Sequence, residues 1–147
     1  FISHTPSENT AKLANRCMTA IKDVTDDLII FHKSSVDVVS KDVLTCDGLL
    51  LATTENIGYM AGLTKDLFDR CYNEWQGTTD GLPAAVYIRA GLDGTATSRA
   101  LSQIVGGLSW RLIRPPLILK GNYIPQFEEE VAELAGAFAA GLESGLF

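Results

Sequence analysis

The stretch Ala84-Ala85-Val86-Tyr87-Ile88 is apolar at every position and shows no alternation of polar and apolar residues. An earlier stretch, Leu49-Leu50-Leu51-Ala52, has the same character. A strand with one face in water alternates with a period of two, whereas a strand buried on both faces is apolar throughout. These two runs therefore predict central strands of a parallel sheet that is covered on both sides.

Working outward, we expect five strands separated by helices. The predicted strands are Phe1–Ser3, Leu28–Phe31, Gly48–Ala52, Ala84–Ala90 and Leu112–Leu119. Between them, apolar residues recur every three or four positions, as on the buried face of a helix. These stripes are Leu13/Ala14/Cys17/Ile21/Val24, Met60/Leu63/Leu67/Cys71, Leu101/Ile104/Val105/Leu108 and Phe127/Val131/Leu134/Phe138/Leu142. A short helix is predicted around Ser40–Thr45.

Strands that alternate with helices imply a three-layer, doubly wound α/β domain with right-handed crossovers. The common order for five parallel strands is 2-1-3-4-5, which we predict here. Pro115-Pro116 lies within the fifth run, and proline belongs on an edge strand or at a break in one because it lacks an N–H donor. We therefore expect one domain over residues 1–147, with its first strand truncated at the N-terminus.

The net charge of the chain limits the kinds of molecule that we expect it to bind. The 147 residues carry a formal net charge of −6, which argues against binding nucleic acid or anionic membranes. Three cysteines, Cys17, Cys46 and Cys71, are scattered without metal-ligand spacing, as in a cytoplasmic protein with reduced thiols. No membrane span, secretory signal or metal site is predicted from the sequence.

Ligands of open parallel sheets bind beyond the carboxyl ends of the strands. We therefore expect a ligand at the three loops that follow the first, third and fourth predicted strands. The first, His4-Thr5-Pro6-Ser7-Glu8-Asn9-Thr10, combines hydroxyls with a helix N-terminus, which favours an anion. The alternative is a capping box from Thr5 to Glu8, with Pro6 as the first helical residue. Glu8 would compete with a phosphate for the same amides.

The second loop, Thr53–Tyr59, mixes polar, glycine and aromatic residues, as a site for a flat heterocycle requires. An ordinary turn with Tyr59 packed on a neighbour is the alternative. The third loop, Ala90-Gly91-Leu92-Asp93-Gly94-Thr95, has two glycines that allow close approach of a ligand. Alternatively, those glycines form a tight turn and Asp93 caps a helix.

At these loops the sequence resembles flavodoxins and the related NAD(P)H-dependent FMN reductases. Thr5-x-Ser7-x-Asn9-Thr10 resembles their phosphate loop, although Glu8 stands where the family has Gly. The stretch from Thr54 to Gly62, followed by Lys65–Arg70, resembles the flavin-ring loop and the next helix of the reductases, with Thr54 where Pro is frequent. Residues 90–95 resemble their third loop. The resemblance spans essentially the whole chain.

The resemblance implies a flavodoxin-like fold that binds FMN, with the flavin rather than a catalytic side chain performing the chemistry. It places the phosphate at the first loop and the ring between the other two. The implied cofactor-binding residues are Thr5, Ser7, Asn9, Thr10, Thr54, Glu55, Asn56, Ile57, Gly58, Tyr59, Gly91, Leu92, Asp93 and Gly94.

The resemblance also implies an enzyme that passes a hydride from NAD(P)H through FMN to a quinone, a flavin or a similar small-molecule acceptor, as a homodimer. Two alternatives remain open: an electron carrier that docks on redox partner proteins, and a flavodoxin-like fold that has lost FMN. Arg89, Arg99 and Lys120 are candidate contacts for the nicotinamide phosphate, or simply solvated side chains.

Three other classes lack the residues that they need. A phospho-receiver domain requires an Asp at the end of the third strand, where this chain has Ala52-Thr53. A dinucleotide-binding enzyme requires G-x-G-x-x-G after the first strand, and a Ser hydrolase requires G-x-S-x-G. His4 and His32 have no evident carboxylate partner. Trp75, Trp110 and Tyr123 belong to the core or an interface, with packing favoured for Trp110.

Overall fold

The computed structural model describes residues 1–147. Helices cover both faces of one mainly parallel sheet. The strands are β1 (Ile2–Ser3), β2 (Lys33–Ser34), β3 (Leu49–Asn56), β4 (Tyr59–Met60), β5 (Pro83–Ala90), β6 (Arg111–Leu112) and β7 (Leu117–Lys120). The helices are α1 (Glu8–Val24), α2 (Ser40–Leu44), α3 (Gly62–Trp75), α4 (Thr95–Gly107) and α5 (Gln126–Glu143).

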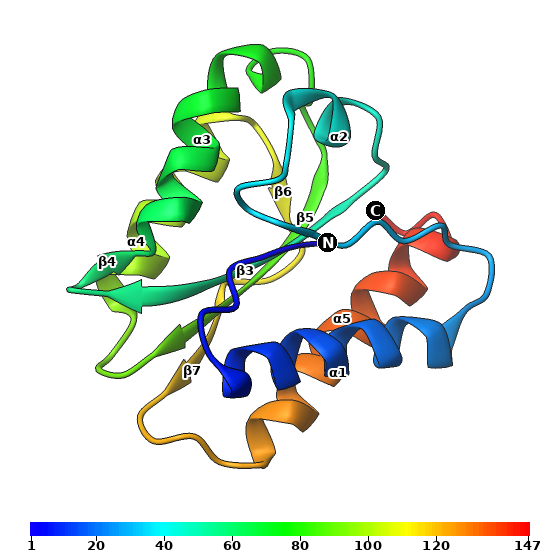
Figure 1. Ribbon diagram of the computed structural model, residues 1–147. Coiled ribbons are helices and arrows are strands. Elements are labelled where there is room, and N and C mark those ends of the chain that lie inside the picture. The colour runs from blue at the N-terminus through cyan, green and yellow to red at the C-terminus, as the bar shows by residue number, and fades with distance from the viewer.

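The two central strands are buried on both faces, as their uninterrupted apolar runs predict. Alternate residues of β3 and β5 point into two separate apolar layers. Leu51 and Ile88 face the layer under α3 and α4, whereas Leu50 and Tyr87 face the layer under α1 and α5. Figure 1 shows α1 and α5 side by side on one face and α3 and α4 on the other.

The sheet has seven strands, rather than the predicted five in the order 2-1-3-4-5. Five of them follow the order β2-β1-β3-β5-β6, while β4 pairs with β3 and β7 with β5 beside this path. The fifth apolar run is divided: β6 pairs with the start of β5 and β7 with its end. Pro115 and Pro116 lie in the gap, which confirms the predicted break. The other additional strand, β4, folds back antiparallel on β3.

The predicted strand Leu28–Phe31 is wrong, since β2 comprises Lys33 and Ser34 instead. Ile29 and Phe31 are 84% and 72% exposed. A strand needs a partner along its length, and β1 offers only Ile2 and Ser3 to β2. Residues 28–31 therefore have the composition of a strand without its ladder of hydrogen bonds.

The sequence left open whether Trp75 and Trp110 lie in the core or at an interface. In the structure both belong to the core. Trp75 is completely buried, and the Trp75 and Trp110 rings lie 5.5 Å apart. The Trp110 indole N–H donates to Thr79 Oγ1 at 2.7 Å. The packing predicted for Trp110 is therefore confirmed.

The three cysteines are free; Cys17 and Cys71 are buried and Cys46 is half-buried. The helices also include no segment with the length and apolar character required to span a bilayer.

Candidate functional site

The carboxyl ends of β1, β3 and β5 meet at one edge of the sheet because these strands are adjacent and parallel. The segments that follow them are the three predicted ligand-binding loops. In Figure 1 this edge lies on the left, where the β3–β4 hairpin and the connection from β5 to α4 project from the sheet. The topology thus brings the three segments to the same side of the molecule.

The first loop caps α1, but with different residues from those predicted. The N-cap is Ser7, whose Oγ accepts from the Thr10 amide at 3.3 Å. The Thr10 hydroxyl oxygen in turn accepts from the Ser7 amide at 3.0 Å. The predicted box from Thr5 to Glu8 is therefore wrong, and Pro6 precedes the helix instead of beginning it. Reciprocal bonding with Thr10 moves the cap two residues along the chain.

This cap leaves backbone donors free at the start of α1. The amides of Thr5, Glu8 and Asn9 have no hydrogen-bond acceptor within the protein. Unpaired amides and the positive end of the helix dipole both favour an anion. Burial lowers the pKa of His4, so the adjacent imidazole is neutral at neutral pH. Backbone donors therefore provide the main attraction for an anion here.

Glu8 does not occupy these amides. Its carboxylate pairs with Lys12 Nζ at 3.1 Å, one turn further along α1, and its side chain is 84% exposed. This geometry removes the predicted competition between the Glu8 carboxylate and a phosphate for the same hydrogen bonds. The negative charge nevertheless remains near the end of the helix.

The second predicted loop is in fact a β-hairpin. Residues 53–56 continue β3, and Glu55 and Asn56 pair with Met60 and Tyr59 of β4. Ile57 and Gly58 form the turn with φ of 53° and 72°, the left-handed values that a tight two-residue hairpin requires. The loop prediction for Thr53–Asn56 is therefore wrong. Thr53 and Thr54 pair with Ile88 and Arg89 of β5, and Glu55 and Asn56 pair with β4.

The hairpin presents apolar side chains to solvent. Ile57 is fully exposed and Tyr59 is 41% exposed, so Tyr59 is not packed away as the alternative interpretation supposed. The Thr54 hydroxyl is already engaged, since it donates to Asn56 Oδ1 at 2.8 Å. β4 also lies against α4, which brings the hairpin beside the third loop.

The third loop is a tight turn, and it also exposes an apolar residue. Gly94 has φ of 70° and is the N-cap of α4, while Asp93 Oδ1 accepts from the Thr95 amide at 2.9 Å. Asp93 therefore stabilises the turn, as the second interpretation of this loop proposed. Leu92, at the tip, is 75% exposed.

These features fit the two halves of a flavin nucleotide. Free amides at α1 suit a phosphate, and the exposed side chains of Ile57, Tyr59 and Leu92 suit a flat, partly apolar ring. The sequence prediction included the three apolar residues as well as the polar ones, and the fold shows in addition that their side chains are exposed.

Arg89 has a structural use that the sequence did not reveal. Its guanidinium donates to the carbonyls of Ala90, Leu119 and Gly121. These contacts account for Arg89 without a nicotinamide phosphate, whereas Arg99 and Lys120 are exposed, as expected of solvated side chains. The structure therefore weakens the prediction of Arg89 as a ligand contact.

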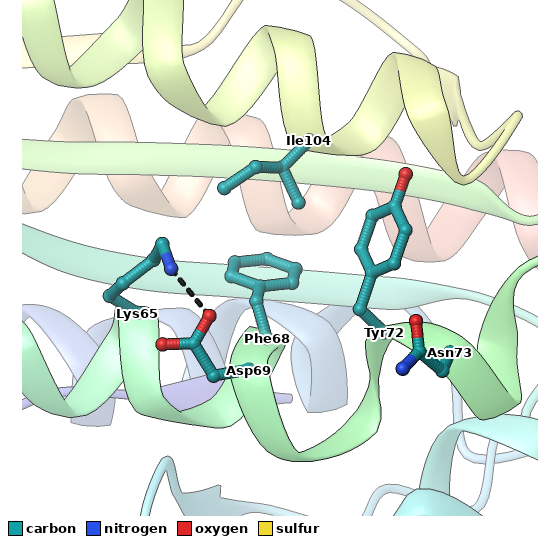
Figure 2. A pocket seen from close by; sticks show the side chains of 6 residues that line it. All are labelled: Lys65, Phe68, Asp69, Tyr72, Asn73 and Ile104. Carbon is teal, nitrogen blue, oxygen red and sulfur yellow. Dashed lines mark hydrogen bonds and ion pairs between the residues drawn. The ribbon is translucent and has the colours of Figure 1, made fainter.

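Two hollows lie away from this edge. A groove of about 300 Å³ runs between α3 and α4, and Figure 2 shows Phe68 and Tyr72 of α3 facing Ile104 of α4, with the Lys65–Asp69 pair beside them. A second cavity of about 420 Å³ lies near the opposite ends of β1 and β3, and its lining includes Phe1, Leu49 and, from α5, Leu142. Neither hollow includes a predicted flavin contact.

Comparison with solved structures agrees with this architecture. An archaeal flavodoxin superposes with a TM-score of 0.81 at 13% identity, covering 97% of this chain and 96% of that chain. Flavodoxin 1 of Bacillus cereus gives 0.74 at 16% identity, covering 93% of each chain. The apo form of an NADH:FMN oxidoreductase, EmoB, gives 0.69 at 17% identity, covering 94% of this chain and 86% of that one.

Sequence comparison adds no further relative: no family model matches the chain, and no curated protein does. The structural similarity shows that the chain has a flavodoxin-like fold. The predicted flavodoxin-like fold is thereby confirmed.

Proposed function

We propose that the chain is an FMN-binding redox protein that oxidises NAD(P)H and reduces a small acceptor such as a quinone or a free flavin. The observation that carries this proposal is the meeting, at one edge of the sheet, of unpaired amides with exposed apolar side chains. The amides belong to Thr5, Glu8 and Asn9, and the apolar side chains to Ile57, Tyr59 and Leu92. A flavodoxin-like fold with this edge supports an anionic, ring-bearing ligand.

In this proposal the start of α1 holds the phosphate. The amides of Glu8 and Asn9 would donate to its oxygens, and the Ser7–Thr10 hydrogen bonds fix the conformation of the turn. The Ser7 hydroxyl lies in the same turn and would contribute. The Thr10 hydroxyl donates to Ser7 O at 2.8 Å and would have to turn away from it to reach a phosphate. Thr5 and Asn9 complete the proposed phosphate contacts.

In the same proposal, the hairpin and the third loop would hold the ring. Thr54, Glu55, Asn56 and Gly58 shape the hairpin, and Ile57 and Tyr59 provide apolar surface. Gly91, Leu92, Asp93 and Gly94 form the other contact region. Covering the ring would remove the exposed apolar surface of Ile57, Tyr59 and Leu92 from water, which favours binding.

Bound FMN would supply the redox chemistry, and the chain would supply binding and orientation. In the net reaction NAD(P)H loses a hydride, which is two electrons and one proton, and becomes NAD(P)⁺. The acceptor takes up those two electrons with two protons, the second of which comes from water. No side chain at the edge is required as an acid or base in this scheme.

An electron carrier is the second candidate. It is favoured by the similarity to flavodoxins along almost the full length of both chains. A carrier would use the same FMN site and exchange single electrons with a docked protein, so the two candidates differ in turnover and not in cofactor.

The absorbance spectrum before and after addition of FMN tests the shared part of the proposal. A flavin spectrum perturbed by the protein, with saturable quenching of FMN fluorescence, is expected; absence of both would overturn FMN binding. Steady-state oxidation of NADH and NADPH with a quinone then separates the candidates, since absence of turnover in the FMN-loaded protein favours the carrier. A homodimer and a cytoplasmic location belong to the enzyme proposal, and sedimentation of the FMN-loaded protein tests the first.

A further inference from the structure

We propose that Arg89 is a positioning residue that holds the third loop, residues 90–95, in the conformation that receives the flavin ring. This inference rests on the proposed function. It assigns Arg89 no contact with the ligand; the residue acts through the strands that carry the loop.

The Arg89 guanidinium bridges four parts of the chain. Nη1 donates to Ala90 O at 2.6 Å and to Leu119 O at 3.1 Å, and Nη2 donates to Gly121 O. The guanidinium carbon also lies 5.3 Å from the centre of the Phe127 ring at the start of α5. One planar cation therefore ties the end of β5 to the end of β7, to the turn after β7 and to α5.

β7 has few other restraints in the sheet. It has four residues, pairs only with β5, and is separated from β6 by the segment that contains Pro115 and Pro116. Short edge strands with one neighbour are held by few hydrogen bonds. The bonds that Arg89 makes to Leu119 and Gly121 thus add to a limited set.

The third loop rests on β7. A Cβ atom at Gly94 would lie 2.6 Å from Ile118 Cγ2, so the backbone of the loop approaches the β7 side chain closely. The Gly121 amide donates to Ala90 O at 2.9 Å, and that carbonyl also accepts from Arg89. A shift of β7 would therefore move both ends of the turn that carries Leu92 and Asp93.

A lysine at position 89 cannot make the same set of contacts as Arg89. The guanidinium presents five donors in a rigid planar fork, whereas an ammonium is a compact charge on a flexible stem. Arg89→Lys keeps the positive charge but loses simultaneous contact with three carbonyls and with the Phe127 ring. It therefore separates the geometric role of Arg89 from its charge.

The experiment compares Arg89→Lys and Arg89→Ala with Arg114→Ala. Arg114 follows β6, and its only ion pair is a 4.0 Å contact with Glu133. Binding of FMN and of riboflavin is followed by fluorescence quenching. We expect both Arg89 variants to bind both flavins about tenfold more weakly, by the same factor, because misplaced contact groups weaken recognition of the ring that the two ligands share. Arg114→Ala keeps the affinities of the unaltered protein.

Chemical rescue provides a readout that a general loss of stability would not give. Methylguanidinium can fill the space left in Arg89→Ala, so it is expected to restore riboflavin affinity there and to have no effect on Arg89→Lys. Unchanged affinity of Arg89→Lys for both flavins would overturn the inference. A loss confined to FMN would also overturn it, because that result places the effect at the phosphate.

Failure of the proposed function is distinguishable from failure of this inference. If the unaltered protein binds neither flavin, the proposed function is overturned and the flavin role of Arg89 falls with it. If flavins bind, hydrogen exchange of the Gly121 amide provides the second measurement. Exchange should be faster in Arg89→Lys than in Arg114→Ala, and equal exchange would overturn the inference.

Discussion

Lys12 Nζ lies 3.1 Å from the Glu8 carboxylate, which draws this acidic side chain along α1 and away from the free amides at the start of the helix. In the proposed site, Glu8 would therefore affect a bound phosphate through its charge and not by occupying hydrogen bonds. Both side chains are largely exposed, so water and salt weaken that effect.

Glu8→Gln should strengthen FMN binding modestly. It removes a negative charge from the first turn of α1, where one charge contributes roughly 0.3–1 kcal/mol, and this corresponds to a two- to fivefold change in affinity, approximately. Riboflavin lacks the phosphate, so its affinity should not change. Fluorescence titration of both flavins measures the effect; equal changes for the two would contradict a phosphate at this helix end.

The buried hydroxyl pair below the hairpin predicts strong coupling between β3 and α3. Thr53 Oγ1 and Thr64 Oγ1 lie 2.7 Å apart, and both residues are buried. Thr53→Val should lower the free energy of unfolding by about 1–3 kcal/mol because it leaves the Thr64 hydroxyl without this partner. The double variant Thr53→Val/Thr64→Val should lose less than the sum of the single variants.

Urea unfolding of the four proteins in this cycle measures the coupling. Strictly additive losses would show that the two hydroxyls contribute independently. Binding of FMN is a useful accompanying measurement, because Thr53 lies beside Thr54 at the base of the hairpin.

The two glycines of the third loop should respond differently to alanine. Gly94→Ala forces a side chain into a left-handed conformation and places Cβ 2.6 Å from Ile118 Cγ2, whereas a Cβ at Gly91 meets nothing within 4 Å. We expect Gly94→Ala to lower the free energy of unfolding by about 1–3 kcal/mol. Gly91→Ala should stay within about 0.5 kcal/mol of the unaltered protein.

Thermal unfolding and riboflavin titration together test this contrast. Gly94→Ala should also weaken riboflavin binding, because the turn that carries Leu92 moves. Equal stability of the two variants would mean that the turn adjusts to the added methyl group at no cost.

Cys17 predicts a loss of stability in alkaline solution. Burial raises the pKa of its thiol to about 12, opposed by the hydrogen bond with Tyr87 and by the charge of Arg16. The unfolded thiol titrates near pH ~8.5, so above that pH the unfolded chain binds fewer protons than the folded one. Stability is therefore retained below this pH and falls as pH rises toward 12.

Urea unfolding of the protein and of Cys17→Ala at several pH values from neutral to alkaline checks this expectation. Cys17→Ala should be less stable at neutral pH because it leaves a cavity, but its stability should decline less steeply with rising pH. Parallel declines would assign the alkaline loss to other groups, such as Tyr87, whose pKa burial also raises.

Whether the prediction for a segment was right depends on how far apart in the sequence the residues lie whose interactions form that segment. The stretches Leu49–Ala52 and Ala84–Ala90 were predictable because burial on both faces requires apolar residues at every position. Leu28–Phe31 has a similar composition but forms no strand, because its pairing depends on the length of β1. The Ser7–Thr10 cap was missed because several hydroxyls in one loop compete for the same amides.

Local patterns alone therefore predicted the helices, except that Met60 lies in β4 and not in α3, as well as the two central strands and the edge position of the prolines. They could do so because side-chain periodicity and backbone chemistry act over a few neighbouring residues. The hairpin at Thr53–Met60, the division of the last strand and the carbonyl contacts of Arg89 depended on the folded arrangement. Each of these joins backbone groups across different strands or turns, and such hydrogen bonds form only when the fold brings their partners together.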